Sequence, residues 1–317
     1  MDERDGAEAS AVLGAAMNAS HPSGFISSWL EAGLDRLERR YEEGAVIDGL
    51  STGLVELDGW LGGLAGGQLV VVAGRPGHGR TSLGLSMAVH AATQCDRLAV
   101  VISLEMRGEV LARRAQAAAA GIDSLRLRTG RLGETDWPRL SGGVGRLCEA
   151  PLFIEDRRTA TVADVEEVCR GAMERSDRPL GLVVVDTIRS IAAEGATRDE
   201  AVISAARDLR RMAETLGVPV VATAPVRRSA ERRPDRRPTL ADLDAPGLED
   251  EADVVLLLYR GELYYPSDPS LRRVMDVMVA KNREGPAPVM VQVAFLPEQG
   301  GRFATVVDGG GTDVGTR

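Results

Sequence analysis

The chain has 317 residues, of which 44% are hydrophobic and only 3% aromatic, so its core must be built mainly from aliphatic side chains. Its length fits one large α/β domain with a small appendage. The net charge of −9 excludes a generally basic nucleic-acid-binding surface. No apolar run reaches the ~18 residues of a membrane span. Three widely spaced cysteines and an acidic N-terminus without a signal peptide's basic start favour a cytoplasmic location with no membrane partner.

The N-terminal part of the chain is composed differently from the remainder. Residues 1–24 are rich in Ala, Ser, Asp and Glu with weak periodicity, which predicts a disordered tail, and we expect the same of residues 306–317. Residues 27–41 carry apolar side chains at helical spacing, which predicts an amphipathic helix. Such a helix packs either on its own domain or on a neighbouring subunit, and the sequence leaves both arrangements open.

From residue 68 onward, apolar runs alternate with helix-like stretches. Continuous apolar runs indicate strands buried on both faces, so the alternation predicts an α/β fold with a mostly parallel central sheet and flanking helices. The predicted strands are residues 69–73, 98–103, 152–155, 182–186 and 218–222, followed by apolar runs over 254–259, 274–280 and 289–295. The predicted helices between strands are residues 110–120, 136–148, 162–175 and 201–216. Functional residues are expected at the carboxyl ends of the parallel strands.

A glycine-rich loop joins the first predicted strand to a predicted helix over residues 82–92. Strand, glycine loop and helix form the context of a phosphate-binding loop, in which backbone N–H groups and the helix start face a phosphate. A glycine turn that merely joins a strand to a helix is the alternative. We expect ATP to bind the loop and Thr81 to place its hydroxyl on Mg²⁺. The nucleotide-binding residues are Gly74, Arg75, Pro76, Gly77, His78, Gly79, Arg80, Thr81 and Ser82.

Arg80 stands where the pattern G-x-x-x-x-G-K-[ST] has lysine. Arginine keeps the positive charge, but its planar guanidinium is wider than the ammonium group that the pattern accommodates. We therefore expect Arg80 to contact the phosphates, and hydrolysis to be slower than with lysine.

Two carboxylates follow predicted strands at the same expected edge of the sheet. Asp186 ends the apolar run of residues 182–186, as an acidic residue that holds magnesium through water does. Glu105 follows the strand over residues 98–103, where it could orient and deprotonate an attacking water. The alternatives are a helix N-cap at Asp186 and a surface glutamate at Glu105.

A cluster of six arginines occupies the loop over residues 226–238, which prolines flank. Because the overall charge is negative, any nucleic-acid surface must be local, and this loop is the best candidate. A solvated, mobile loop is the alternative. The residues assigned to nucleic-acid contact are Arg227, Arg228, Arg232 and Arg233.

An ordered series of motifs extends the pattern over most of the chain. They are S-L-E-M at 103–106, R-T-G at 128–130 with D-W at 136–137, V-P-V-V-A at 218–222, R-S at 228–229, D-E-A-D at 250–253, Y-R at 259–260 and K-N-R-E-G-P at 281–286. Together they resemble the C-terminal motor domain of DnaB-type replicative DNA helicases, a RecA-like fold. The resemblance implies a linker helix over residues 25–46, a RecA-like ATPase domain over residues 47–305 and no counterpart of the family's N-terminal helical domain in these residues. It further implies a homo-oligomer, a hexameric ring, that binds ATP, Mg²⁺ and single-stranded DNA.

Lys281 and Arg283 are two residues apart at the end of an apolar strand, before a turn at residues 284–286. Their spacing lets both side chains leave the same face of the strand. The resemblance implies that they are catalytic and act on the nucleotide of a neighbouring chain. A solvated basic pair at a strand end is the alternative.

The chain also departs from the family pattern. Arg80 replaces the loop lysine, Arg189 replaces the glutamine of D-x-x-Q, and Pro225 replaces the glutamine of S-Q-x-N-R. Asp244 lies at or near a family arginine in the loop that grips DNA. Two hypotheses stay open: an ATP-driven helicase in replication or repair, and a hydrolysis-attenuated oligomer that serves as scaffold or regulator. A recombination or clock ATPase of the RecA superfamily is a third, against which the K-N-R-E-G-P motif argues.

Overall fold

The computed structural model describes residues 25–43 and 47–305. The predicted tails, residues 1–24 and 306–317, lie outside the described residues. Helix α2 (Ile26–Glu43) belongs to one compact unit and residues 47–305 to another. The helix predicted near the N-terminus is therefore present, and its apolar side chains Leu30, Leu34 and Leu37 are exposed.

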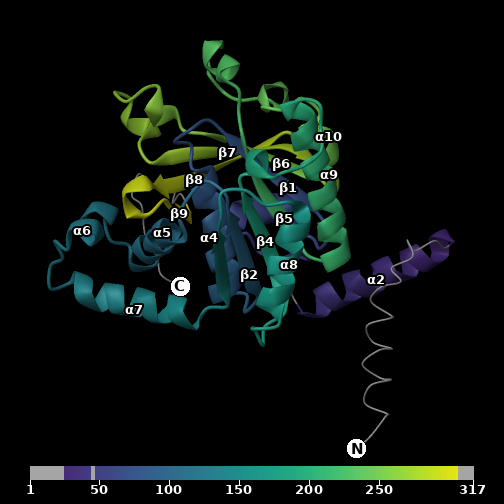
Figure 1. Ribbon diagram of the computed structural model, residues 1–317, viewed down its shortest axis with the longest axis horizontal. Helices are drawn as coiled ribbons and strands as arrows, with labels where there is room; N and C mark the ends of the chain where they lie inside the picture. Colours follow the sequence, from purple (N-terminus) through teal and green to yellow (C-terminus); the bar gives the residue numbers. More distant parts are fainter. Residues whose placement is uncertain (1–24, 44–46, 306–317) are drawn as a thin grey trace, which may run out of the picture. The chain divides into compact units, whose positions relative to one another are not determined.

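Residues 47–305 are organised around a nine-stranded sheet with the strand order β3-β2-β4-β5-β1-β6-β7-β8-β9 (Figure 1). The parallel strands are β1 (Leu69–Gly74), β2 (Leu98–Ser103), β3 (Leu152–Asp156), β4 (Leu180–Asp186), β5 (Val220–Pro225) and β6 (Val254–Tyr259). The strands added antiparallel to β6 are β7 (Val274–Asn282), β8 (Val289–Leu296) and β9 (Arg302–Thr305). The predicted α/β fold with a mostly parallel sheet is confirmed.

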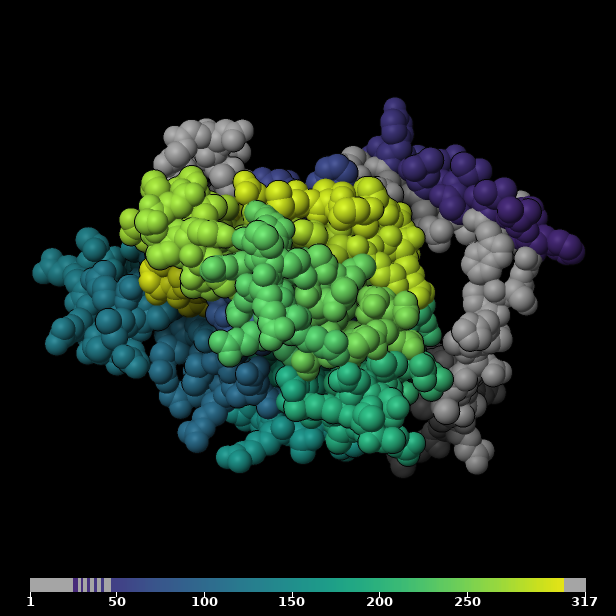
Figure 2. Space-filling view, turned by 90° about the horizontal axis from the view of Figure 1, so that it is seen from above, coloured from purple at the N-terminus to yellow at the C-terminus, as the bar shows by residue number. Residues whose placement is uncertain are grey.

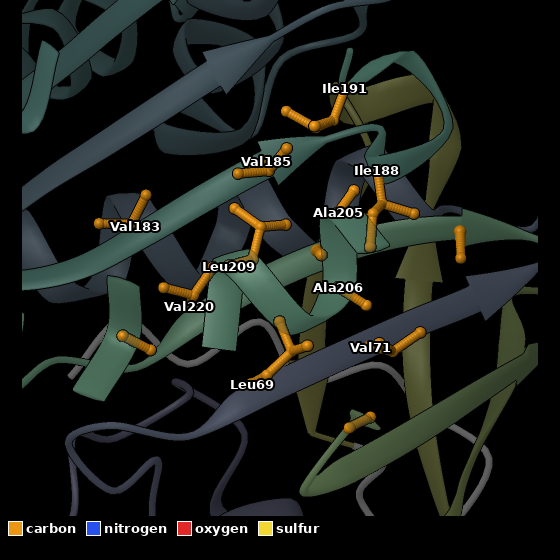
Figure 3. Close-up of a cluster of buried hydrophobic side chains, with 14 of the residues drawn as sticks. Leu69, Val71, Val183, Val185, Ile188, Ile191, Ala205, Ala206, Leu209 and Val220 are labelled. Atoms are coloured by element: carbon orange, nitrogen blue, oxygen red, sulfur yellow. The ribbon is translucent and has the colours of Figure 1, made fainter. Parts of the chain in front are cut away.

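Helices cover both faces of this sheet (Figure 1). Alternate residues of a strand face opposite sides, so Val70 and Val72 of β1 pack in one core cluster while Leu69 and Val71 pack in another. The first cluster includes side chains of α4 (Arg80–Thr93) and α5 (Gly108–Ala120), and the second includes those of α8 (Val162–Met173) and α9 (Arg198–Leu216). Figure 3 shows part of the second cluster, in which Leu209 of α9 lies among valines of β4 and β5.

Two of these helices begin at capping boxes. Thr161 caps α8 together with Asp164, and Thr197 caps α9 together with Glu200, each pair exchanging side-chain and backbone hydrogen bonds. The remaining helices and 3₁₀ turns are α3 (Val55–Leu61), α6 (Ser124–Thr129), α7 (Asp136–Glu149), α10 (Leu248–Glu251), η1 (Ile188–Ser190), η2 (Arg228–Arg232), η3 (Leu240–Asp242), η4 (Gly261–Leu263), η5 (Pro269–Leu271) and η6 (Pro297–Gln299). Among the described helices, none is long and apolar enough to cross a membrane.

The strands of the sheet end at two opposite edges. Pro225 at the end of β5 pairs with Gly74 at the end of β1, and β4 runs parallel to β5, so the carboxyl ends gather at one edge. Because β7 is antiparallel to β6, its last residue, Asn282, pairs with Val254 at the opposite edge. A strand advances ~3.3 Å per residue, so the length of β1 separates the two edges by roughly 17 Å.

Candidate nucleotide-binding site

The glycine loop connects β1 to α4 at the carboxyl edge of the sheet. Gly77 and Gly79 have φ angles of 81° and 86°, a left-handed conformation that side chains rarely adopt. A Cβ atom on Gly79 would lie 2.8 Å from Cε of Met275, so a side chain here would also require Met275 to shift. α4 begins at the next residue, which directs its free N–H groups into the loop.

A pocket of about 670 Å³ opens beside this loop. Every predicted loop residue except Gly74 and His78 lines it, and so does the exposed side chain of Glu105. Glu105 is the one carboxylate among the described lining residues, whereas six arginines face the same space. Those arginines are Arg75, Arg80, Arg113, Arg114, Arg128 and Arg260. The excess positive charge suits a polyanionic ligand.

Arg80 opens α4 at the position of the pattern lysine. Burial lowers the pKa of its guanidinium, an effect that the charges of Glu105 and Asp186 oppose. Its Nη1 atom is buried and has no hydrogen-bond partner among the described residues. A buried donor without a partner is costly unless a ligand satisfies it, so Arg80 fits a phosphate oxygen.

Asp186 ends β4 within the core and is 2% exposed. One carboxylate oxygen, Oδ1, accepts a 2.6 Å hydrogen bond from Oγ1 of Thr223, while the buried Oδ2 has no partner within the described residues. The described part of the chain holds no cluster of three or more His, Cys, Asp or Glu residues that could bind a metal alone. The free oxygen of Asp186 and the hydroxyl of Thr81 nevertheless fit Mg²⁺, which is commonly held by one or two protein groups plus substrate phosphates.

The side chain of His78 has a structural role in the glycine loop. Its side chain is buried, Nδ1 forms a 3.1 Å hydrogen bond with the Leu258 carbonyl, and Nε2 lies 3.4 Å from the Tyr264 hydroxyl. Burial lowers its pKa to about 4, so the ring is neutral near pH 7. The side chain of His78 therefore anchors the loop to β6 instead of facing the pocket.

Two of the pocket arginines, one of them in the loop itself, also hold the loop in place. Arg75 donates from Nε to Glu231 and from Nη1 to the Val226 carbonyl, both at 3.0 Å. Arg260 donates to the Gly77 carbonyl at 2.6 Å.

Sequence reasoning assigned no role to four of the six pocket arginines. Arg128 and Arg260 belong to the R-T-G and Y-R motifs, which was the only sequence feature that pointed to them. No sequence feature pointed to Arg113 or Arg114. α5 carries Arg113 and Arg114, and α6 carries Arg128, so these helices bring cations to the pocket from a distant part of the chain.

The four arginines predicted to contact nucleic acid lie in residues 226–238, which we call the arginine loop, and they fall into two groups. Arg227 is partly buried, pairs with Asp199 at 3.3 Å and donates to the Asp244 carbonyl, while Arg233 pairs with Asp242. Arg228 and Arg232 are exposed. Figure 2 shows the green segment that carries them at the surface, beside the yellow-green segment of η4 and η5. Arg232 has no ion pair among the described residues, and Arg228 makes only an exposed contact of 3.6 Å with Glu231, so this pair is available to a ligand. The other two arginines hold the loop together.

Lys281 and Arg283 lie at the opposite edge of the sheet from the glycine loop. Lys281 donates from Nζ to the Glu249 carbonyl at 2.5 Å, and Arg283 donates to the Asp250 carbonyl at 3.0 Å. Arg283 also pairs with Asp253 at 3.3 Å. Burial, together with the charge of Arg283, lowers the pKa of Lys281. The structure thus brings Glu105, Asp186 and the loop together but places this basic pair apart from them.

The family model described as "DnaB-like helicase C terminal domain" matches residues 49–304. The chain belongs to this family. The predicted resemblance to DnaB-type helicases is therefore confirmed over almost the whole of the sheet-bearing unit.

Relatives and solved structures agree with the family. Replicative DNA helicase DnaB of Geobacillus stearothermophilus is 34% identical over 268 residues, covering 83% of this chain and 58% of that relative. The counterpart from Leifsonia xyli subsp. xyli is 34% identical over 265 residues, covering 83% and 57%. This chain thus spans less than two thirds of each relative.

Among solved structures, one described as an ATPase domain superimposes with a TM-score of 0.81 at 28% identity, covering 90% of this chain and all of that one. A DnaB-like replicative helicase studied with primase gives the same TM-score at 27% identity, covering 90% of this chain and 68% of that one. A RadB recombinase reaches a TM-score of 0.50 at 20% identity, covering 81% of this chain and 100% of that one, a likeness of fold alone.

Proposed function

We propose that the chain is a ring-forming, ATP-driven motor that translocates on or unwinds DNA in replication or repair. One observation carries the proposal: Glu105 lines the arginine-rich pocket around the glycine loop, and the charges of Glu105 and of Asp186, at the end of β4, both act on Arg80 of that pocket. Membership of a helicase family supports the proposal that ATP is the anion bound in this pocket. A pocket lined by six arginines and one exposed carboxylate suits the transfer of a phosphoryl group to water.

Each residue has a definite task in this proposal. The loop N–H groups and Arg80 bind the phosphates, and Thr81 and Asp186 hold Mg²⁺, which supplies positive charge against the phosphate oxygens. Glu105 is exposed and lines the pocket, so it can orient an attacking water and accept its proton.

The position of the basic pair supports a ring. Arg283 is anchored beside Asp253 near the start of β1, roughly 17 Å along the strand from the glycine loop. Its side chain is too short to reach the nucleotide of its own chain, so Lys281 and Arg283 must act on a neighbour's nucleotide if they act in catalysis. A head-to-tail arrangement in which each chain completes the next site can close into a ring, and we propose a ring of six chains as in the family's hexamers.

A second candidate function is a nucleotide-binding oligomer with weakened hydrolysis, acting as scaffold or regulator. The guanidinium of Arg80 in place of an ammonium favours it, and so does Pro225, which offers neither a backbone N–H nor a side-chain amide. Both candidates share the same pocket and the same assembly. They differ in turnover.

Turnover measurements with and without single-stranded DNA test the proposal. We expect the wild-type protein to bind a fluorescent ATP analogue and to hydrolyse ATP faster when DNA is present. Glu105→Gln should bind the analogue but hydrolyse ATP ~100-fold more slowly or worse, since a general base contributes about that much. Glu167→Gln, at an exposed position of α8, is the matched control and should behave as wild type. Binding without turnover would establish the second candidate, and failure to bind would refute both.

A further inference from the structure

Two of the residues that depart from the family pattern contact each other. Arg189 Nη1 and Asp244 Oδ2 lie 3.1 Å apart, and about a third of each side chain is exposed. Arg189 belongs to η1, directly after β4, and Asp244 follows η3. The residues at these two positions therefore carry opposite charges and form an ion pair. We call this ion pair between Arg189 and Asp244 the bridge.

The bridge lies at the nucleotide edge of the sheet. The backbone N–H of Asp244 donates to the carbonyl of Pro225, which pairs with Gly74 at the start of the glycine loop. The charge of Asp244 also acts on Arg80. Nε of Arg189 is buried and lacks a hydrogen-bond partner among the described residues. Arg189 is thus held by one contact and has a donor left over.

A short packed segment leads from the bridge to the opposite edge. Residues 245–253 bury Ala245, Leu248 and Ala252 against the core. The segment ends at Asp253, which exchanges two hydrogen bonds of 2.9 Å with the backbone of Leu69, the first residue of β1. It therefore spans the sheet from the nucleotide edge to the edge of the basic pair.

The same segment holds that basic pair. Lys281 binds the Glu249 carbonyl, while Arg283 binds the Asp250 carbonyl and the Asp253 carboxylate. All three partners lie within residues 245–253. A displacement of the segment would move the contacts that aim Lys281 and Arg283.

We propose that Arg189 and Asp244 are positioning residues: their bridge sets where residues 245–253 hold Lys281 and Arg283, so that phosphate in one site adjusts the cations offered to the neighbouring site. This inference rests on the proposed function. An entering phosphate attracts Arg189 and repels Asp244, which opposes the bridge. The buried side chains of the segment move together because a packed core deforms between discrete arrangements and not continuously.

Charge reversal tests the bridge. Arg189→Asp and Asp244→Arg each place like charges together and should lower kcat roughly 2- to 30-fold, the range for residues in a coupling network. The Kd of a fluorescent ATP analogue should rise in Arg189→Asp and fall in Asp244→Arg, because phosphate is attracted by the first residue and repelled by the second. The double variant restores opposite charges and should recover most of kcat. Asp244→Asn removes one charge while keeping the shape, and thermal unfolding identifies any variant that fails to fold. Exchange of the exposed α8 pair Glu166 and Arg170 is the control.

A double variant that combines Asp244→Asn with Arg283→Lys decides whether the bridge acts through Lys281 and Arg283. If it does, Asp244→Asn should cost less kcat in the Arg283→Lys background than in wild type, because coupled residues are not additive. Additive effects, or a folded double reversal no faster than the single variants, would overturn the inference. A wild-type protein without turnover would instead refute the proposed motor and the inference with it, while normal turnover in every bridge variant would refute the inference alone.

Discussion

Arg80 combines two properties that bear on rate: its guanidinium is partly buried, and Nη1 lacks a partner among the described residues. A slim ammonium is the group for which the loop pattern is built. We predict that Arg80→Lys raises kcat. One well-placed transition-state contact is worth ~3–4 kcal/mol, or ~100- to 1000-fold, and Arg80 already supplies part of it through its charge. Steady-state ATPase assays measure the change, with Arg170→Lys on α8 as control. An unchanged or lower rate would mean that the loop is adapted to arginine.

The functional residues that could be predicted from the sequence are those that directly follow a recognisable apolar strand. Glu105 and Asp186 follow apolar strands, and parallel strands bring their carboxyl ends together, so both could be assigned to one edge before the fold was seen. Arg113 and Arg114 could not, because only the packing of α5 directs them into the pocket. The orientation of the His78 side chain could not be predicted, since its hydrogen bond to Leu258 joins residues 180 positions apart. The catalytic roles themselves stay predictions.

The arginine loop is the element whose function depends most on which side chains are free. We predict that Arg228→Ala with Arg232→Ala weakens the binding of single-stranded DNA and flattens its salt dependence. Each phosphate contact contributes about 0.7 to the slope of log K against log salt for single strands, so losing two contacts should reduce the slope by about 1.4. Fluorescence anisotropy over a salt series measures it. Replacing the exposed arginines Arg170 and Arg211 on α8 and α9 is the control. Unchanged affinity would identify the loop as a solvated surface.

A run of arginines in a sequence does not reveal which of them form ion pairs with carboxylates in the folded chain. Arg227 and Arg233 bind Asp199 and Asp242, and only the path of the chain brings these carboxylates within reach. Short elements were missed for a related reason: α6 has six residues and no buried side chain, so hydrophobic periodicity gives it no signal. The long strands and helices, which bury aliphatic side chains, were predicted with nearly their observed bounds.

At the scale of the whole molecule, the separation of Glu105 from Arg283 can be tested by mixing. We predict that Glu105→Gln and Arg283→Ala are each nearly inactive alone but regain turnover when co-assembled, provided that wild type is active. Some interfaces then pair an intact Glu105 with an intact Arg283 of the next chain. ATPase activity after subunit exchange measures the rescue, and each variant mixed with itself is the control. Absence of rescue in rings shown to be mixed would contradict a shared site.

The overall architecture was largely readable because continuous apolar runs alternate with helices. The sequence did not specify the direction of the last three strands, and this direction decides the most consequential distance in the molecule. Antiparallel pairing of β7 with β6 carries Lys281 away from the edge where β1, β4 and β5 end. A parallel β7 would have placed the basic pair beside its own glycine loop.

This placement at opposite edges makes any assembly built on it directional. Each chain would present a phosphate loop on one side and a basic pair on the other, so contacts are head-to-tail and two chains joined in this way complete a single site. An open row of chains always has one site fewer than its members, and closing the row adds the missing site without adding a chain. In such an assembly the number of complete sites per chain would rise as chains join and fall on dilution.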